Sequence, residues 1–272
     1  MPIHHLTLAA DGRQALFPSE AERRLAVRTL ARVGGASIVL FSVVDEHVHV
    51  VANLEPEGEG RLARALLLAL RPLTSVSLDP ARVRPVEGRS HLERLVRYVL
   101  QQPVHHGIPT HPALWTGSCF PDLVGARILP GFQATLAEFL PRLPQAALFG
   151  AVGLSVTDGR PTPTDTLRHL GATRIRDAAT AVLAVGPDLE GRADDVVAVQ
   201  AATCLLAQEA GIARREVASA IGVPLRTAQR RVHHVVPAEI LDAVRVHLAL
   251  EEAVRRAPPV VPPAGPTAGS RP

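Results

Sequence analysis

Residues 38–54, IVLFSVVDEHVHVVANL, form a run of apolar and β-branched residues that predicts a buried β-strand. The run carries two histidines, His47 and His49, on either side of Val48. Side chains two residues apart on a strand point to the same face, so the two imidazoles project together, about 7 Å apart along the backbone. At that spacing they can share one divalent ion. The alternative is a pair of exposed histidines with no ligand role.

The segments around this strand alternate between helix-like and strand-like patterns. Residues 18–35 predict an amphipathic helix, because Ser19 is a suitable N-cap with Glu22 three residues later. The other expected elements are a first strand at 3–10, a helix at 59–73, an extended or hairpin segment at 75–88, and a helix at 90–104 that Pro103 closes. This order predicts an α+β fold, a small antiparallel sheet with helices packed on it.

Length and composition limit the class of protein. A chain of 272 residues with 47% hydrophobic content can bury one or two cores. Its longest apolar runs are shorter than the roughly 20 residues needed to cross a bilayer. The N-terminus has no basic region followed by an apolar one, so we expect a cytoplasmic protein without a secretory signal. The two cysteines, Cys119 and Cys204, lie far apart and are expected to be buried free thiols.

The charge of the chain permits nucleic-acid binding without requiring it. The formal net charge is +3, and every basic residue is an arginine because the sequence contains no lysine. Arginine makes bidentate contacts to phosphate, which lysine cannot do.

Tyr98, the only tyrosine of the chain, lies within the segment RLVRYVLQQPVHHG, residues 94–107. Gln102 follows one helical turn later, so both side chains face the same way on the expected helix. Beside a metal ion, a tyrosine is a suitable nucleophile for a phosphodiester, and two imidazoles with one amide make a mixed site that suits Mg²⁺ or Mn²⁺. The alternative is that Tyr98 packs against the core and Gln102 is a polar residue at the helix end.

Together these motifs resemble the HUH single-tyrosine transposases, in particular the REP-associated tyrosine transposases. The resemblance rests on HVH after an apolar run, RYVLQQPVHHGI about fifty residues later, the opening HHLTLAADGRQALFPSEAERRLAVRTLARV, and HPALWTGSCFPDLVG. It covers residues 1–125 and implies an HUH, ferredoxin-like catalytic domain. It also implies that His47, His49 and Gln102 hold a divalent ion. Tyr98 would then attack single-stranded DNA to form a 5′-phosphotyrosine.

The chain departs from that family in one place. The family usually has an aromatic and basic segment resembling GHLFQGRYK before the last strand, and this chain lacks it. Much of the phosphate-binding surface is then either missing or supplied by Arg71, Arg82 and Arg84. Aromatic residues make up only 3% of the chain, and the one tryptophan, Trp115, is either a core residue or a stacking platform for bases.

A further histidine group follows the tyrosine. Its members are His105, His106 and His111, with Cys119 a little later. Their spacing matches no ordinary structural zinc pattern, and the segment is rich in proline. We therefore expect solvated loop histidines near DNA phosphates rather than a zinc site.

The second half of the chain has a different pattern. Residues 126–190 contain short helical stretches broken by proline and glycine, and are expected to form a helical connector. Within residues 191–256, EVASAIGVPLRTAQRRV looks like a helix-turn-helix of the AraC type, with Gly222 as the turn glycine. The tail, residues 257–272, is rich in proline, glycine and alanine and is expected to be flexible.

The expected recognition helix runs from residue 224 to residue 233. Arginine reads guanine and glutamine reads adenine in the major groove of duplex DNA. The side chains expected to face that groove are Arg226, Thr227, Gln229, Arg230 and Arg231. The alternative is a structural helical hairpin with a solvated basic face.

The sequence therefore predicts a DNA-processing protein of the cytoplasm and nucleoid, with an HUH-like domain followed by a helix-turn-helix. The predicted reaction is metal-dependent cleavage of hairpin-bearing single-stranded DNA by Tyr98. Two alternatives stay open: a non-catalytic DNA-binding regulator derived from a domesticated transposase, and a nuclease that uses metal-bound water. Whether a monomer or a homodimer builds one active site is also open.

Overall fold

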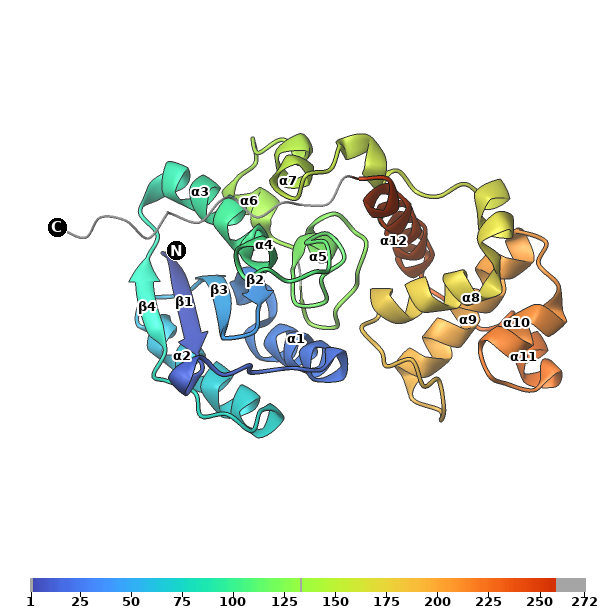
Figure 1. The fold of residues 1–272 in the computed structure, drawn as a ribbon, viewed down its shortest axis with the longest axis horizontal. Helices are drawn as coiled ribbons and strands as arrows, with labels where there is room; N and C mark the ends of the chain where they lie inside the picture. The colour runs from blue at the N-terminus through green and yellow to red at the C-terminus, as the bar shows by residue number, and fades with distance from the viewer. Residues whose placement is uncertain (1, 133, 258–272) are drawn as a thin grey trace.

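The computed structural model describes residues 2–132 and 134–257 (Figure 1). In this part of the chain, one four-stranded antiparallel sheet is accompanied by helices, which confirms the predicted α+β class. The strands are β1 (Ile3–Ala9), β2 (Ile38–Val43), β3 (His47–Asn53) and β4 (Arg82–Pro85), in the spatial order β2-β3-β1-β4. Residues 258–272, in the tail that we expected to be flexible, lie outside the described residues.

Residues 38–54 form a hairpin of two strands, not the single strand that we expected. A turn that carries Asp45 and Glu46 leads from β2 into β3, and the N–H of Val44 donates to the carbonyl of His47 at 3.0 Å. The expectation was wrong because the apolar run conceals the turn. Strands of globular proteins usually have about 3–10 residues, so a run of this length folds back on itself.

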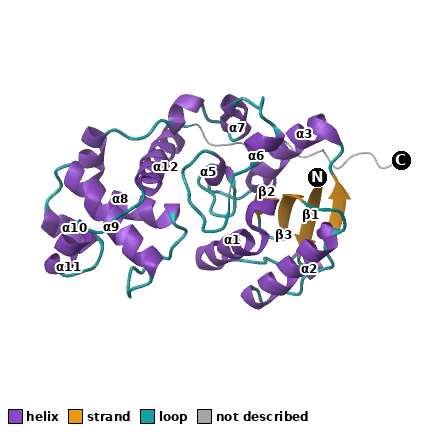
Figure 2. Cartoon of the chain, turned by 180° about the vertical axis from the view of Figure 1, so that it is seen from behind, coloured by secondary structure: helices purple, strands orange, loops and turns teal. Residues whose placement is uncertain are grey.

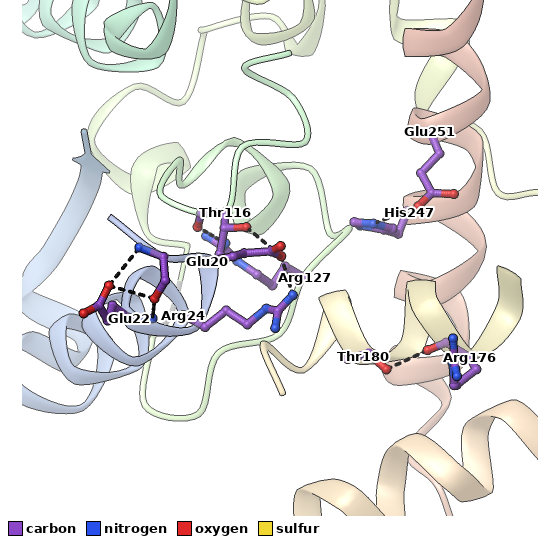
Figure 3. Close-up of polar contacts among 10 residues, drawn as sticks. Glu20, Glu22, Arg24, Thr116, Arg127, Arg176, Thr180, His247 and Glu251 are labelled. Atoms are coloured by element: carbon purple, nitrogen blue, oxygen red, sulfur yellow. Dashed lines mark hydrogen bonds and ion pairs between the residues drawn. The ribbon is translucent and has the colours of Figure 1, made fainter. Parts of the chain in front are cut away.

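The helix predicted at residues 18–35 is α1 (Glu20–Gly34), with the expected capping box (Figure 3). The hydroxyl of Ser19 accepts from the N–H of Glu22 at 3.2 Å, and the carboxylate of Glu22 accepts from the N–H of Ser19 at 2.8 Å. The helix ends before Gly35, whose φ of +50° favours glycine. Local sequence signals therefore fix both ends of α1.

The remaining helices of the first half are shorter than α1. The helix predicted at 59–73 is α2 (Gly58–Leu70) with one additional 3-10 turn, and the segment at 75–88 contains the edge strand β4. The helix predicted at 90–104 is divided into α3 (Gly88–Leu100) and α4 (Gln102–His105), and this break shapes the candidate site. The elements that follow are α5 (Phe120–Leu123), α6 (Leu136–Phe139) and α7 (Gln145–Ala151).

The first hydrophobic core covers one face of the sheet and part of the other, where Val51 of β3 is buried. Leu6 and Leu8 of β1 and Val48 and Val50 of β3 are completely buried, in one cluster with Leu30 of α1 and residues of α2. Burying one such side chain stabilises the fold by about 1.5–3 kcal/mol. Because side chains alternate along a strand, the odd-numbered residues of β1 and β3 point to the opposite face. The rest of that second face is available for polar residues.

Helices alone form a second hydrophobic core, seen apart from the sheet in Figure 2. They are α8 (Thr164–Val182), α9 (Asp194–Glu209), α10 (Arg214–Ala220), α11 (Leu225–Arg231) and α12 (Ala238–Arg256). The expectation of short broken helices holds only in part, because α8 continues across a kink at Gly171, where φ is +80°. Helix α12 also places Val246 and Leu250 in the first core, so it joins the two parts.

The buried Arg127 holds together the segment of residues 116–127, which faces α12. Arg127 donates to both carboxylate oxygens of Asp122 and to the carbonyls of Thr116 (2.7 Å, Figure 3) and Ser118 (2.6 Å). Burial raises the pKa of Asp122, and the guanidinium of Arg127 opposes that effect. From α12, His247 points towards this loop (Figure 3). Removing either partner would leave the other charge buried without a counter-charge, which is costly. The ion pair therefore keeps the loop in place.

Both cysteines are free and buried, as the sequence predicted. Burial raises the pKa of the Cys119 thiol to about 12 and that of the Cys204 thiol to about 11. Among the described helices, none is both long enough and apolar enough to cross a bilayer.

A histidine and tyrosine cleft as the candidate active site

The face of the sheet opposite the first core carries a cleft of about 480 Å³. Residues directly opposite each other in antiparallel strands point to the same face. Thr7 of β1 lies opposite both His49 of β3 and Arg82 of β4, and His5 lies opposite Arg84. Three neighbouring strands therefore contribute side chains to one surface.

A chain of hydrogen bonds crosses this cleft. His5 Nε2 lies 3.0 Å from His49 Nδ1, and His49 Nε2 lies 3.1 Å from Gln102 Oε1. The amide nitrogen of Gln102 then donates to the backbone carbonyl of Tyr98 at 3.2 Å. His49 is only 3% exposed, and both of its ring nitrogens have partners. The chain connects β1, β3, α3 and α4.

Tyr98 and Gln102 are not on one continuous helix, contrary to our expectation. Helix α3 ends at Leu100, and Gln102 is the first residue of α4. Pro103 does not close a helix but lies in the first turn of α4, where proline is tolerated because its missing N–H would have no helical partner. Gln102 still reaches back to Tyr98 through its amide, as described above.

The phenol of Tyr98 is accessible beside the buried imidazole. Tyr98 is 43% exposed, and its ring centroid lies 5.4 Å from that of His49 and 6.3 Å from that of His5. The ring of His47 lies 4.4 Å from that of His49 and 4.7 Å from that of His106. The four residues predicted for the active site, His47, His49, Tyr98 and Gln102, are thus brought together.

Two further histidines belong to this group. The sequence did not indicate His5, and His106, which was expected to be a solvated loop histidine, is half-buried. His5 bonds to His49, and His106 lies against His47. The pattern IHHLTLA offered a signal for His5, because one of two adjacent strand histidines must face away from the core. Sequence alone does not tell whether His4 or His5 does so, since that depends on the register of β1 against β3.

Burial keeps these imidazoles uncharged. It lowers the pKa of His49 to about 2, with additional effects of His47 and His5. Burial also lowers the pKa of His5 to about 4, with the guanidinium of Arg84 acting in the same direction. The pKa of His47 is lowered by burial and by the neighbouring His106, while Gln102 acts in the opposite direction. At neutral pH all three are neutral, which is the form that binds metal ions.

The predicted metal ligands are not those of an ordinary structural zinc site. Among the described residues, no group of three or more histidine, cysteine, aspartate or glutamate side chains is arranged to hold a metal. The predicted set has two imidazoles and one amide instead. His49 Nε2 and Gln102 Oε1 are 3.1 Å apart. Neighbouring ligands of an octahedral Mg²⁺, at 2.0–2.1 Å from the ion, are separated by about 3.0 Å.

Arginines lie on both sides of Tyr98. Arg82 and Arg84 line the histidine cleft, whereas the exposed Arg71 does not. A second cavity of about 480 Å³ borders Tyr98 from the surface of α3, with Arg94 and Arg97 in its wall. Glu46 and Asp79 also line the cleft, and Glu93 lines the second cavity, so Tyr98 stands between two surfaces that carry both arginines and carboxylates.

The other residues considered near the tyrosine have structural roles. Trp115 is buried, and its indole N–H donates to the carbonyl of Val43 at 2.8 Å, so it is a core residue rather than a stacking platform. His111 Nδ1 accepts from the N–H of Ala113 at 3.2 Å. The raised pKa of Cys119 disfavours the thiolate that zinc requires.

Helices α10 and α11 pack on α9 and are joined by a tight turn. Gly222 has a φ of +67°, its N–H donates to the carbonyl of Ser219 (3.2 Å), and the N–H of Val223 donates to that of Ala218 (3.1 Å). This pair of bonds is the Schellman arrangement that ends helices at a glycine. Ala228 of α11 is buried in the second core.

The five residues predicted to face the major groove lie on different sides of α11. Arg226, Gln229 and Arg230 are exposed, and we call these three the α11 face. Thr227 and Arg231 are half-buried, and Arg231 donates to Gln200 of α9 at 2.9 Å. Arg231 therefore supports the helix packing.

Acid is expected to destabilise the folded protein through His49. Its imidazole titrates near 6.5 in the unfolded chain and near 2 in the folded one, so below pH 6.5 only the unfolded state takes up this proton. Stability is present above that pH and lost as the pH falls, by up to about 1.4 kcal/mol per pH unit. Urea unfolding in EDTA, from neutral pH to about pH 5, should show a smaller loss for His49→Gln. Equal losses in wild type, His49→Gln and the exposed-site control His233→Gln would contradict this.

Comparisons with family models, with curated proteins and with solved structures found no match for this chain. Its function is therefore inferred from the chemistry of the cleft and of the α11 face.

Proposed function

We propose that the chain is a metal-dependent single-stranded DNA endonuclease of the HUH transposase type, with Tyr98 as the nucleophile. The observation that carries this proposal is the convergence of His47, His49 and Gln102 beside an accessible tyrosine, although about fifty residues separate the histidines from Tyr98. A packing role does not account for a tyrosine residue that is 43% exposed. A tyrosine beside residues that could hold a divalent ion can act as the nucleophile of a transesterification.

In the proposed reaction, the phenolic oxygen of Tyr98 forms a bond to phosphorus while the bond from phosphorus to the 3′ oxygen breaks. The phenolic proton ends on the released 3′-hydroxyl, and the 5′ phosphate stays on Tyr98. A bound Mg²⁺ or Mn²⁺ would neutralise charge on the non-bridging phosphate oxygens. His47, His49 and Gln102 would hold that ion, and the burial of His49 and Gln102 fixes their positions.

The surface around Tyr98 suits a single DNA strand. Arg82 and Arg84 lie in the cleft on one side of the tyrosine, and Arg94 and Arg97 lie on the other. Guanidinium groups on both sides can hold successive phosphates, so that one phosphodiester lies over Tyr98. These arginines take the place of the basic segment that the chain lacks.

A covalent protein–DNA adduct is the expected product. Wild type incubated with labelled hairpin oligonucleotides, taken from the DNA that flanks its gene, should give a shifted band on a denaturing gel in Mn²⁺. Tyr98→Phe has no oxygen to attack phosphorus, so it should give no adduct, and EDTA should abolish the band in wild type. His4→Gln, on the opposite face of the sheet, should behave as wild type.

The outcomes separate the alternatives for this domain. DNA binding without any adduct, while a related transposase cleaves its own hairpin in the same assay, would favour a non-catalytic regulator. Cleavage that persists in Tyr98→Phe would favour hydrolysis by metal-bound water.

We further propose that α10 and α11 form a helix-turn-helix that holds duplex DNA. Its support is the glycine turn at Gly222 together with the exposed α11 face, which carries two arginines and one glutamine. These side chains are of the types that read guanine and adenine in the major groove. Arg231 is excluded from this role by its bond to Gln200.

Substitutions on α11 should separate DNA contact from helix packing. Arg226→Ala should weaken binding to a duplex from the flanking DNA by about 1–3 kcal/mol, with little change in thermal stability. Arg231→Ala, the matched control, should lower the melting temperature and change affinity less. Fluorescence anisotropy and thermal denaturation measure the two effects. Equal affinities for wild type and Arg226→Ala would contradict the assignment.

A further inference from the structure

A cavity of about 670 Å³ lies between α11 and the α8–α9 loop, residues 183–193. The loop contributes Gly191 and Arg192 to its wall, and α11 contributes Thr227, Arg230 and Arg231. In Figure 1 the loop lies between α1 and α11. This cavity is separate from the cleft at the tyrosine, because the two share no lining residue.

Positive charge predominates in the wall of this cavity. The wall holds three guanidinium groups, those of Arg192, Arg230 and Arg231, and one carboxylate, that of Glu190. Arg192 and Arg230 are exposed, and among the described residues neither forms an ion pair. Arg231 differs, because part of its guanidinium is bonded to Gln200. Two guanidinium groups without a counter-charge are therefore available to an anion.

The buried side chain of Gln200 connects the loop to α11. Gln200 is 2% exposed, its amide nitrogen donates to the carbonyl of Leu189 in the loop at 2.9 Å, and its amide oxygen accepts from Arg231 at 2.9 Å. Leu189 also packs in the second core. A buried amide without partners is costly, so these bonds stabilise the position of the loop beside α11. Arg192 thus extends from a loop that is anchored three residues earlier.

The position of the cavity beside the α11 face indicates which anion it receives. Arg230 belongs to both surfaces. A helix with its side chains is about 10–12 Å across and the major groove is about 12 Å wide, so the phosphates of both strands lie directly beside a helix in the groove. Residues next to such a helix therefore meet backbone phosphates, which guanidinium groups bind well. The anion that suits this position is a phosphodiester of duplex DNA.

We propose that this cavity binds a backbone phosphate of duplex DNA and that Arg192 is the residue that contacts it. Arg192 approaches the phosphate from the α8–α9 loop while α11 lies in the major groove. The contact fixes the position of α11 on the duplex and is independent of the base sequence. This inference rests on the proposed helix-turn-helix, and it adds to that unit a loop that lies outside α10 and α11.

The salt dependence of binding distinguishes a phosphate contact from a base contact. Each phosphate contact releases counterions, so its loss makes the slope of log K against log salt concentration shallower by about 0.9. Arg192→Ala should show this change, and its loss of affinity should shrink about 3.5-fold between about 50 and about 200 mM NaCl. The loss should be equal for a duplex from the flanking DNA and a duplex of scrambled sequence. Fluorescence anisotropy of the full-length protein measures all of these affinities.

Three further variants serve as controls. Arg192→Lys keeps the positive charge and should retain the slope of wild type. Arg226→Ala should reduce the preference for the flanking duplex rather than weaken both duplexes equally. Arg64→Ala removes an exposed arginine of α2 and should match wild type. Thermal denaturation should show equal melting temperatures for wild type and Arg192→Ala, because Arg192 is exposed.

A titration of the protein alone with pyrophosphate tests the other source of the same chemistry. Calorimetry at constant ionic strength would detect saturable binding. Binding that Arg192→Ala abolishes, together with unchanged duplex affinity in that variant, would assign the cavity to a free phosphate compound and overturn the inference.

Two other results would overturn the inference while leaving the helix-turn-helix intact. One is a folded Arg192→Ala protein with the duplex affinity and salt slope of wild type. The other is a loss confined to the flanking duplex, which would make Arg192 a base-reading residue. A wild-type protein that binds neither duplex would overturn the helix-turn-helix and this inference together. A shallower slope in Arg192→Ala, with no effect of Arg226→Ala, would support the inference and contradict only the base contact.

Discussion

Burying an imidazole costs least when both of its ring nitrogens have partners, and His49 meets this condition through His5 and Gln102. The requirement couples elements that are far apart in the chain. It fixes β1 beside β3, places the start of α4 over the sheet, and through Gln102 holds the backbone of Tyr98. The position of Tyr98, the proposed nucleophile, therefore depends on the hydrogen bonds of His49.

The break between α3 and α4 is part of the same arrangement. A continuous helix would carry Gln102 along the axis of α3, whereas the turn at Gln101 lets its amide face His49 and still reach the carbonyl of Tyr98. Pro103 fits the new helix start, since no helical hydrogen bond is lost there. The exposed Tyr98 is thus held beside the buried side chains of His49 and Gln102, with arginines on either side of it.

Local signals in the sequence predicted what local interactions determine. The Ser19 and Glu22 capping box and the glycine turn at Gly222 follow from neighbouring residues, and both are present. The two-residue spacing of His47 and His49 is also a local signal, because side chains two apart on one strand point to the same face. The turn at Asp45 was missed because apolar residues continue on both sides of it. The role of His5 was missed because strand register decides it, and register is set by pairing across the whole sheet. The sequence also could not tell that Arg231 bonds to Gln200 of α9, because this contact depends on how the two helices pack.

The most direct test of the proposed chemistry is to find the DNA on the tyrosine. Tyr98 follows Arg97, and no lysine or arginine lies between Tyr98 and Arg127. Trypsin therefore releases the only tyrosine of the chain as the first residue of peptide 98–127. After incubation with hairpin DNA and Mn²⁺, and then nuclease digestion, mass spectrometry should find this peptide carrying a nucleotide through its phosphate. Cleaved DNA together with an unmodified peptide would contradict the account.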